Sequence, residues 1–220
     1  MKPKAIIFDL DGTLIDSAPD LRTACNKLLT QYGRRLISID ETMTFVGNGA
    51  PKLIERAFRA TGTEATSEDI PKLTQEFLQF YDGHEADETC LYEGGEETLA
   101  SLQNKGYRLA LCTNKPKQPT LNLLGDLKIA DHFELVVGGD ELERKKPDPQ
   151  MIHFVLNEMG LEAGDAIMIG DSSNDIEAAK NANMRNIAVS YGYRKVPVED
   201  LGADHVVDHI SDIVAIIEAQ

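Results

Sequence analysis

Short apolar runs alternate with helical patterns along most of this chain. The runs cover residues 5–8, 107–112, 135–137, 166–169, 187–190 and 205–207. Helical spacing of apolar residues fills most of the gaps, at residues 95–105, 119–127, 149–159, 174–183 and 212–218. Strands that are apolar on both faces are typical of a parallel sheet covered by helices. The sequence therefore predicts an α/β fold with a doubly wound, Rossmann-like parallel sheet, in which ligands bind beyond the carboxyl ends of the strands.

The first gap in this alternation is unusually long. Roughly a hundred residues separate the first apolar run from the second, whereas a crossover between parallel strands needs about a dozen or more. Apolar residues in this segment recur at helical spacing, for example between Leu21 and Leu28. We therefore predict a helical domain over residues 17–82, inserted into a core domain formed by residues 1–16 and 83–220.

The charge of the chain limits its partners. The formal net charge is −15 at pH 7, and such a surface repels phosphate backbones, so we expect no nucleic-acid partner. A phosphorylated substrate must then be held by local features against this field. The same field favours a divalent cation wherever carboxylates cluster.

The chain shows no membrane or secretion signal. No apolar stretch approaches the ~20 residues of a membrane span, and the start, Met-Lys-Pro-Lys, leads directly into the first apolar run. We therefore expect a cytoplasmic protein without a membrane partner. Its oligomeric state, monomer or homodimer, stays open.

Two aspartates follow the first apolar run, in the segment DLDGT. Strand side chains alternate, so Asp9 and Asp11 can project the same way, and Gly12 permits a sharp turn. Two neighbouring carboxylates raise at least one pKa unless a cation compensates. This pair is therefore a candidate site, whereas we expect Asp16 to cap the helix that follows.

The loops after the second and third runs supply polar and basic groups. The segment LCTNKP carries the hydroxyl of Thr113, the amide of Asn114 and an ammonium group, which can hold phosphate oxygens together with turn N–H groups. Lys146 is the best phosphate candidate of the basic segment ERKKPDP, because Pro147 restricts the local backbone. The alternatives are an ordinary turn and a solvated charged turn.

The fourth run ends in GDSSND, again with two aspartates. Asp175 begins a predicted helix, where the helix dipole favours a carboxylate, so a purely structural role is an alternative for it. Asp171 has no such explanation, because it directly follows a buried strand. We therefore count Asp171 among the candidate site residues.

These four segments, in this order, resemble those of the haloacid dehalogenase (HAD) superfamily of phosphotransferases. The matching positions are DLDGT at 9–13, Thr113 after a strand, Lys146 before Pro147, and GDSSND at 170–175. The resemblance covers essentially the whole chain. It implies a HAD-like α/β core, and the insertion resembles the α-helical cap domain of the first type.

Further segments resemble the phosphoglycolate phosphatase branch of this superfamily. They are SAPDL, VGNGAPKLIERA, TNKP and VSYGY. One departure is Asn183, where many relatives have glycine. It stands at a predicted helix end, where Asn can also adopt the left-handed conformation.

The resemblance implies a phosphatase that works through an aspartyl-phosphate intermediate, and a carboxylate can act as such a nucleophile. Asp9 would attack phosphorus, and Asp11 would protonate the leaving oxygen and then activate water. The carboxylates and the phosphate together need a hard cation, and Mg²⁺ fits because it binds one or two carboxylates and keeps waters. We expect its ligands to be the side chains of Asp9 and Asp171 and the carbonyl of Asp11.

The remaining motif residues would support this chemistry. We expect Thr113, Asn114 and Lys146 to hold the equatorial phosphate oxygens, where charge accumulates in the transition state. Asp175 would orient either a bound water or Lys146. Gly12 belongs to the same predicted phosphate-binding turn.

The inserted helical domain would exclude water and select the leaving group. The backbone N–H groups of Gly47 and Asn48 could face a small anion, and Lys52 or Arg56 could pair with a carboxylate such as that of glycolate. The alternative is that this segment only starts a helix and that Lys52 is solvated.

We therefore expect a Mg²⁺-dependent phosphomonoester hydrolase that acts on a small phosphorylated metabolite, with 2-phosphoglycolate as the leading candidate. Three alternatives stay open. They are another small-molecule or sugar-phosphate phosphatase, a sugar phosphomutase of the same fold, and a non-catalytic binding protein. The last is disfavoured because every chemical position is occupied.

Overall fold

A six-stranded parallel sheet forms the centre of the protein, as the apolar runs predict. The computed structural model describes residues 2–193 and 195–219. Within them the strand order is β5-β4-β1-β6-β7-β8. The strands are β1 (Ala5–Phe8), β4 (Arg108–Cys112), β5 (Leu135–Val137), β6 (Ala166–Gly170), β7 (Arg185–Val189) and β8 (His205–Val207). The two that carry the aspartate motifs, β1 and β6, are neighbours.

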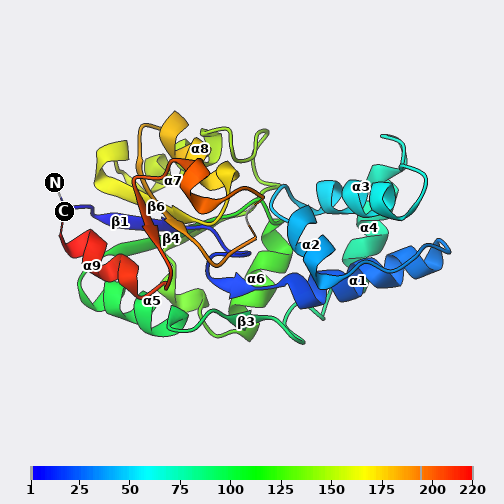
Figure 1. Ribbon diagram of the computed structural model, residues 1–220. Coiled ribbons are helices and arrows are strands. Elements are labelled where there is room, and N and C mark those ends of the chain that lie inside the picture. The colour runs from blue at the N-terminus through cyan, green and yellow to red at the C-terminus, as the bar shows by residue number, and fades with distance from the viewer. Residues whose placement is uncertain (1, 194, 220) are drawn as a thin grey trace.

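Helices cover both faces of this sheet (Figure 1). They are α5 (Gly95–Asn104), α6 (Lys117–Asp126), α7 (Gln150–Met159), α8 (Ser173–Asn181) and α9 (Asp212–Glu218), with short 3-10 turns at Ala130–His132, Ala163–Asp165 and Val198–Leu201. Alternate side chains of β1 point to opposite faces. Ile6 packs in the cluster that includes α5, α6 and α9, and Ile7 in the cluster that includes α7 and α8. No helix of residues 2–193 and 195–219 has the length and apolar character needed to cross a membrane.

A second group of helices lies at the end of the molecule opposite the two termini (Figure 1). These are α1 (Ala18–Gln31), α2 (Ile39–Phe45), α3 (Ala50–Thr61) and α4 (Ile70–Tyr81), and they share a hydrophobic cluster of their own. Leu28, Ile54 and Phe77 are buried in it. We call these four helices the cap; the domain boundaries predicted beside residues 17 and 82 stay a prediction.

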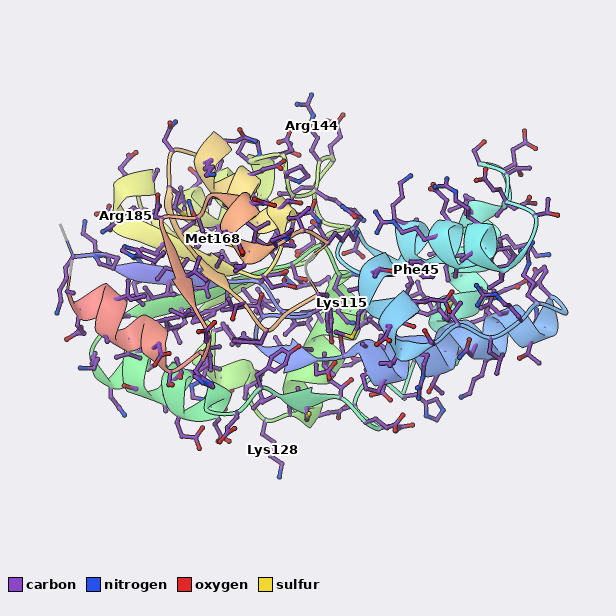
Figure 2. All side chains as sticks on the ribbon, in the orientation of Figure 1. Phe45, Lys115, Lys128, Arg144, Met168 and Arg185 are labelled. Atoms are coloured by element: carbon purple, nitrogen blue, oxygen red, sulfur yellow. The ribbon has the colours of Figure 1, made fainter. Side chains whose placement is uncertain are left out.

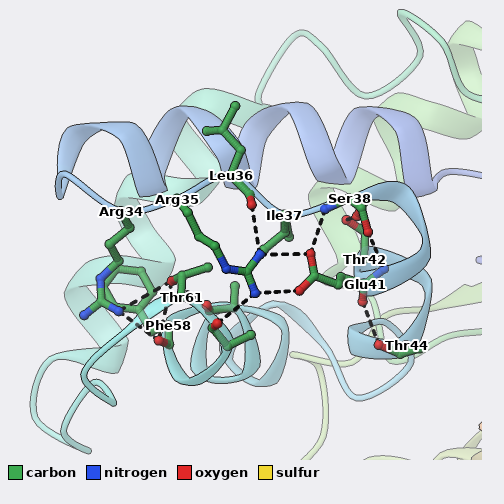
Figure 3. A network of polar contacts seen from close by, with 12 residues as sticks. Arg34, Arg35, Leu36, Ile37, Ser38, Glu41, Thr42, Thr44, Phe58 and Thr61 are labelled. Atoms are coloured by element: carbon green, nitrogen blue, oxygen red, sulfur yellow. Dashed lines mark hydrogen bonds and ion pairs between the residues drawn. The ribbon is translucent and has the colours of Figure 1, made fainter.

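Polar contacts fix the segment between α1 and α2 against α3 (Figure 3). The guanidinium of Arg35 donates to Glu41 at 2.7 Å and to the carbonyl of Ala60 at 2.8 Å. Ser38 and Glu41 form a capping box at the start of α2. Because Arg35 donates both to Glu41 and to the carbonyl of Ala60, it holds the start of α2 and the end of α3 together.

A small antiparallel ribbon joins the cap to the core. It pairs β2 (Ile15–Asp16), where the chain enters the cap, with β3 (Cys90–Leu91), where it returns. The carboxylate of Asp20 accepts hydrogen bonds from the backbone N–H groups of Glu88 and Thr89 and from the Thr89 hydroxyl. The two connections are therefore fastened to each other. Two-residue strands carry no detectable periodicity, so the sequence did not indicate this ribbon.

The predicted cap role of Asp16 is only part of what this residue does. Ser17, not Asp16, is the N-cap residue of α1. One oxygen of Asp16 accepts the N–H of Ala18 at 3.3 Å and also the hydroxyl of Tyr193. That hydroxyl in turn accepts the N–H groups of Ser17 and Ala18 at 2.7 and 2.9 Å. Tyr193, far along the chain, thus anchors the start of the cap.

Candidate active site

Three aspartates meet at the carboxyl edge of β1 and β6. The strands pair with Phe8 opposite Ile169, so the residues after them, Asp9 and Asp171, become neighbours. Asp175 joins them from the first turn of α8. One carboxylate oxygen of each lies within 4.8 Å of the others, and all three side chains are buried. The structure thus brings together the aspartates of two separate sequence motifs.

Lys146 is the cation of this cluster. Its ammonium nitrogen lies 2.5 Å from Asp175 Oδ1, 2.6 Å from the carbonyl of Cys112 and 3.0 Å from Asp9 Oδ1. Burial alone lowers the pKa of a lysine, but the carboxylates of Asp175 and Asp9 outweigh it and raise the pKa of Lys146. Lys146 is therefore charged, and Asp175 orients it.

Asp9 carries an oxygen that is not satisfied within the protein. Asp9 Oδ1 is buried and accepts no hydrogen bond from residues 2–193 and 195–219, so its contact with Lys146 is an ion pair without hydrogen-bond geometry. Burial, with a smaller contribution from Asp175, raises the pKa of Asp9 to about 7. Burial likewise raises the pKa of Asp171, with Asp175 and Asp9 adding to it. Close, desolvated carboxylates with an unpaired oxygen fit a hard divalent cation.

The carboxylate oxygens of the cluster accept different numbers of hydrogen bonds. Asp175 Oδ2 accepts the N–H and the hydroxyl of Ser172 at 3.1 and 2.7 Å, so Asp175 has both oxygens engaged. Asp171 accepts the N–H of Tyr193 at 2.6 Å and, at 3.3 Å, the hydroxyl of Thr13. Among the described residues Asp175 accepts three hydrogen bonds and Asp171 two, and Asp9 Oδ1 accepts none, so Asp9 and Asp171 are the freer donors for a cation.

Gly12 allows the first motif to pass close to Asp171. Its φ is +86°, and a Cβ at this position would lie 2.5 Å from Asp171 Oδ2. A larger residue would therefore displace that carboxylate. The geometry assigns Gly12 a role in close packing, and its contact with phosphate stays a prediction.

Asp11 lies beside the cluster rather than in it. Its Oδ1 accepts the hydroxyl of Ser17 at 2.6 Å and the ammonium of Lys115 at 3.3 Å. The side chain of Asp11 is 12% exposed, about as much as that of Asp9 at 11%, whereas that of Asp175 is fully buried. Asp11 thus faces the junction between core and cap, where a leaving group would be.

Thr113 and Asn114 follow β4, but they are used differently. Thr113 is buried and lines the cavity that contains Asp9 and Asp11. The amide of Asn114 donates to the carbonyls of Gly47 and Lys146, at 2.9 and 3.0 Å, and its oxygen accepts the N–H of Lys146. Both N–H donors of the Asn114 amide are therefore engaged within the protein, and phosphate binding by this side chain stays a prediction.

The Gly47 loop of the cap contacts the core through polar groups. The carbonyl of Gly47 accepts from Asn114 and from Asn174, both at 2.9 Å. The side chain of Asn48 donates to Asn174 and accepts from Arg56 and Lys195. The loop thus docks on the core through the Gly47 carbonyl and the Asn48 side chain, and the contact of its N–H groups with a small anion stays a prediction.

The two predicted cap cations lie in different surroundings. Lys52 is exposed and pairs with Glu55 at 2.6 Å, which favours the solvated alternative over a contact with substrate. Arg56 donates to the carbonyl of Phe45 and to Asn48, at 2.6 and 2.7 Å. Arg56 lines a cavity on the Asp171 side of the Gly47 loop, away from Thr113.

The sequence offered the ammonium of Lys115 only as a possible phosphate contact, and it did not indicate Tyr81 as a residue of this site. The ammonium of Lys115 donates to the hydroxyl of Tyr81 at 2.8 Å and lies over its ring, as well as contacting Asp11. Burial lowers the pKa of Lys115, but Asp11 and Tyr81 raise it by more. The sequence placed Lys115 after Thr113 in a strand-end loop, but its burial depends on α4, which is remote in the sequence.

A small cavity of about 40 Å³ lies where these groups meet. Asp9, Asp11, Thr113 and Lys115 form its core side. The cap side is largely apolar and includes Leu21, Val46, Ala50, Leu53, Phe77, Leu78 and Tyr81. The site can therefore hold a phosphate among the motif residues and a compact leaving group under the cap.

Comparison with known proteins agrees with this geometry. The family model of the haloacid dehalogenase-like hydrolases matches residues 6–189. The chain is 39% identical to a phosphoglycolate phosphatase of Caulobacter vibrioides, over 94% of this chain and 88% of that protein. It is 41% identical to a phosphoglycolate phosphatase of Rhodospirillum rubrum, over 96% of this chain and 89% of that protein.

A solved structure is also closely similar. The crystal structure of a predicted phosphoglycolate phosphatase from Haemophilus somnus superposes with a TM-score of 0.93. The two chains are 32% identical, and the match covers 98% of each. The likeness therefore includes the cap as well as the sheet.

Proposed function

This chain belongs to the haloacid dehalogenase-like hydrolase family and is a phosphatase, and we propose that it hydrolyses 2-phosphoglycolate with Mg²⁺ as its cofactor. The observation that carries this proposal is the cluster of Asp9, Asp171 and Asp175 with Lys146. Asp9 Oδ1 is buried there and accepts no hydrogen bond from the described residues, and the ammonium of Lys146 forms an ion pair with it at 3.0 Å. Such a site can bind a phosphate beside a carboxylate nucleophile.

Asp9 is the proposed nucleophile, and its carboxylate would form the aspartyl-phosphate intermediate. Asp9 and Asp171 would hold Mg²⁺ through their side chains, with the Asp11 carbonyl as a further ligand. When bound, the cation supplies the positive charge that lets an anionic carboxylate approach an anionic phosphate.

Asp11 is the proposed general acid and base. Its place beside the cluster, facing the cavity, suits a group that protonates the leaving oxygen and then takes a proton from water. The Ser17 hydroxyl, 2.6 Å from Asp11 Oδ1, fixes the orientation of this carboxyl.

Lys146 and Thr113 are the proposed contacts of the equatorial phosphate oxygens. Lys146 is oriented by Asp175 and by the Cys112 carbonyl, so its charge is in place before substrate binds. Asn114 supports Lys146 through the Lys146 backbone, which makes it a positioning residue in this proposal.

The cavity supports a small leaving group. A volume of about 40 Å³ corresponds to only a few water molecules, so a compact leaving group such as glycolate needs less displacement of the cap than a sugar, although a second cavity of about 240 Å³ also reaches Asp11 and Asp171. A sugar-phosphate phosphatase and a sugar phosphomutase are the alternatives, and both would require the cap to open further around the bound substrate.

A phosphate-release assay over a few dozen phosphomonoesters, with and without Mg²⁺, tests this proposal. We expect the highest kcat/KM with 2-phosphoglycolate, and no turnover after chelation of the metal. A higher kcat/KM for sugar phosphates would overturn the substrate assignment. Interconversion of a hexose 1-phosphate without release of free phosphate would instead identify a mutase.

A further inference from the structure

We propose that Lys115 binds the carboxylate of the leaving group and thereby selects 2-phosphoglycolate over neutral phosphate esters of similar size. This inference rests on the proposed function and names the residue that carries its selectivity. Lys115 lies at the junction of the core and the cap (Figure 2). Lys115 follows β4 and so belongs to the core, whereas Lys52 and Arg56 belong to α3 of the cap.

The ammonium of Lys115 is buried but not saturated. Its side chain is only 4% exposed, and an ammonium group carries three N–H donors. The contacts within residues 2–193 and 195–219 use two of them, on the Tyr81 hydroxyl at 2.8 Å and on Asp11 Oδ1 at 3.3 Å. One donor is left for a group inside the cavity.

The lining of the cavity explains why this free donor matters. Among the described residues that line it, Lys115 is the single cation. The walls contributed by Val46, Leu53 and Phe77 offer no hydrogen bond to an anion. A carboxylate that enters this space loses its water and gains nothing from these walls, so it must pair with Lys115.

The position of Lys115 relative to Asp11 fits the covalent structure of the substrate. In 2-phosphoglycolate a single CH₂ group separates the ester oxygen from the carboxylate. If Asp11 protonates the ester oxygen, only this CH₂ group separates that oxygen from the carboxylate. The ammonium of Lys115 lies 3.3 Å from Asp11 Oδ1, so it is close enough to reach the carboxylate. Lys52, by contrast, is exposed and paired with Glu55.

A second role for Lys115 would give a different result. If Lys115 only holds Asp11 in position, its loss affects the hydrolysis of every substrate alike. If it binds the carboxylate, its loss affects substrates with an anionic leaving group most. Comparison of a charged and a neutral substrate of the same size separates these two roles.

The test compares kcat/KM for 2-phosphoglycolate and ethyl phosphate in the full-length wild type and in Lys115→Met, with Mg²⁺ present. We expect Lys115→Met to lower kcat/KM for 2-phosphoglycolate about 100-fold more than that for ethyl phosphate, mainly through KM, because the loss on ethyl phosphate reports only the missing contact with Asp11. Lys52→Met is the matched control and should leave both values unchanged. Equal losses on both substrates would overturn the inference.

A second variant and a binding measurement guard against misfolding. Lys115→Gln keeps hydrogen-bond donors for Tyr81 and Asp11 but carries no charge, and the preference for 2-phosphoglycolate should collapse there too. In an Asp9→Asn background, calorimetry should show weaker binding of 2-phosphoglycolate, but not of ethyl phosphate, when Lys115→Met is added. Unchanged binding would contradict a role in carboxylate recognition.

The measurements distinguish a wrong substrate assignment from a wrong role for Lys115. A wild type with no preference for 2-phosphoglycolate over ethyl phosphate would refute the proposed substrate. A wild type with a strong preference that both Lys115 variants retain would refute the role of Lys115 alone.

Discussion

The ammonium nitrogen of Lys146 lies 2.5 Å from Asp175 Oδ1, and both side chains are buried. This pair joins the loop before α7 to the first turn of α8, and it sets the charge next to Asp9. Removal of one partner from such a pair leaves an uncompensated buried charge, which is costly. The pair therefore links the stability of the core to the electrostatics of the site.

Lys146→Met should impair both properties. We expect kcat to fall by about 10²–10³-fold, because a preorganised positive charge at the phosphate is lost. We expect the free energy of unfolding to fall by about 3–5 kcal/mol, because Asp175 loses its buried partner. Steady-state kinetics and urea unfolding measure these effects. Arg144→Met is the control, since Arg144 projects from the surface (Figure 2), and losses of similar size there would contradict the assignment.

The metal-free protein should lose stability as the pH rises through neutrality. Burial raises the pKa of Asp9 from 3.8 to about 7, so the folded protein retains a proton that the unfolded chain releases between these values. The free energy of unfolding then decreases with pH in that window. In EDTA, the wild type should lose more thermal stability between pH 5 and pH 8 than Asp9→Asn, which cannot titrate there. Parallel losses in the two proteins would rule this out.

Tyr193→Phe should weaken the attachment of the cap. The hydroxyl accepts the buried N–H groups of Ser17 and Ala18, and these lose an acceptor in the variant. We expect a loss of about 1–3 kcal/mol in the free energy of unfolding. Tyr32→Phe removes an exposed contact with Glu76 and should cost no more than about 0.5 kcal/mol. Equal costs in the two variants, measured by urea unfolding, would argue against the anchor.

Asn174→Ala should disturb closure of the cap without harming the fold. Asn174 donates to the Gly47 carbonyl at 2.9 Å and accepts from Asn48 at 3.1 Å. Loss of both contacts should raise KM about tenfold, with little change in unfolding free energy. Glu177→Ala, on the exposed side of the same helix, is the control. An unchanged KM in Asn174→Ala would show that these contacts do not hold the closed state.

The core of the site could be predicted because its signals are local. Asp9 and Asp171 directly follow apolar runs, and parallel strands bring such positions to one edge. Lys146 was favoured because Pro147 restricts its backbone. The left-handed conformation of Asn183, with φ of 55°, also agrees with its predicted place at a helix end.

The cap side of the site could not be predicted in the same way. Lys52 and Lys115 are both lysines near polar motifs, and only the packing of α4 against the loop after β4 decides which one is buried. The use of Asn114 depends on Gly47, far from it in sequence. Such choices are made by tertiary contacts, which leave no periodic pattern in the chain.

The central claim is that Asp9 becomes phosphorylated during turnover, and chemical trapping tests it most directly. Wild type and Asp9→Asn are mixed with Mg²⁺ and 2-phosphoglycolate, quenched, reduced with borohydride and mapped by peptide mass spectrometry. We predict reduction of the acyl phosphate to homoserine at residue 9 in the wild type, and none in Asp9→Asn, which should fold normally but not turn over. Trapping at another carboxylate, or turnover by Asp9→Asn at a near-normal rate, would contradict the account.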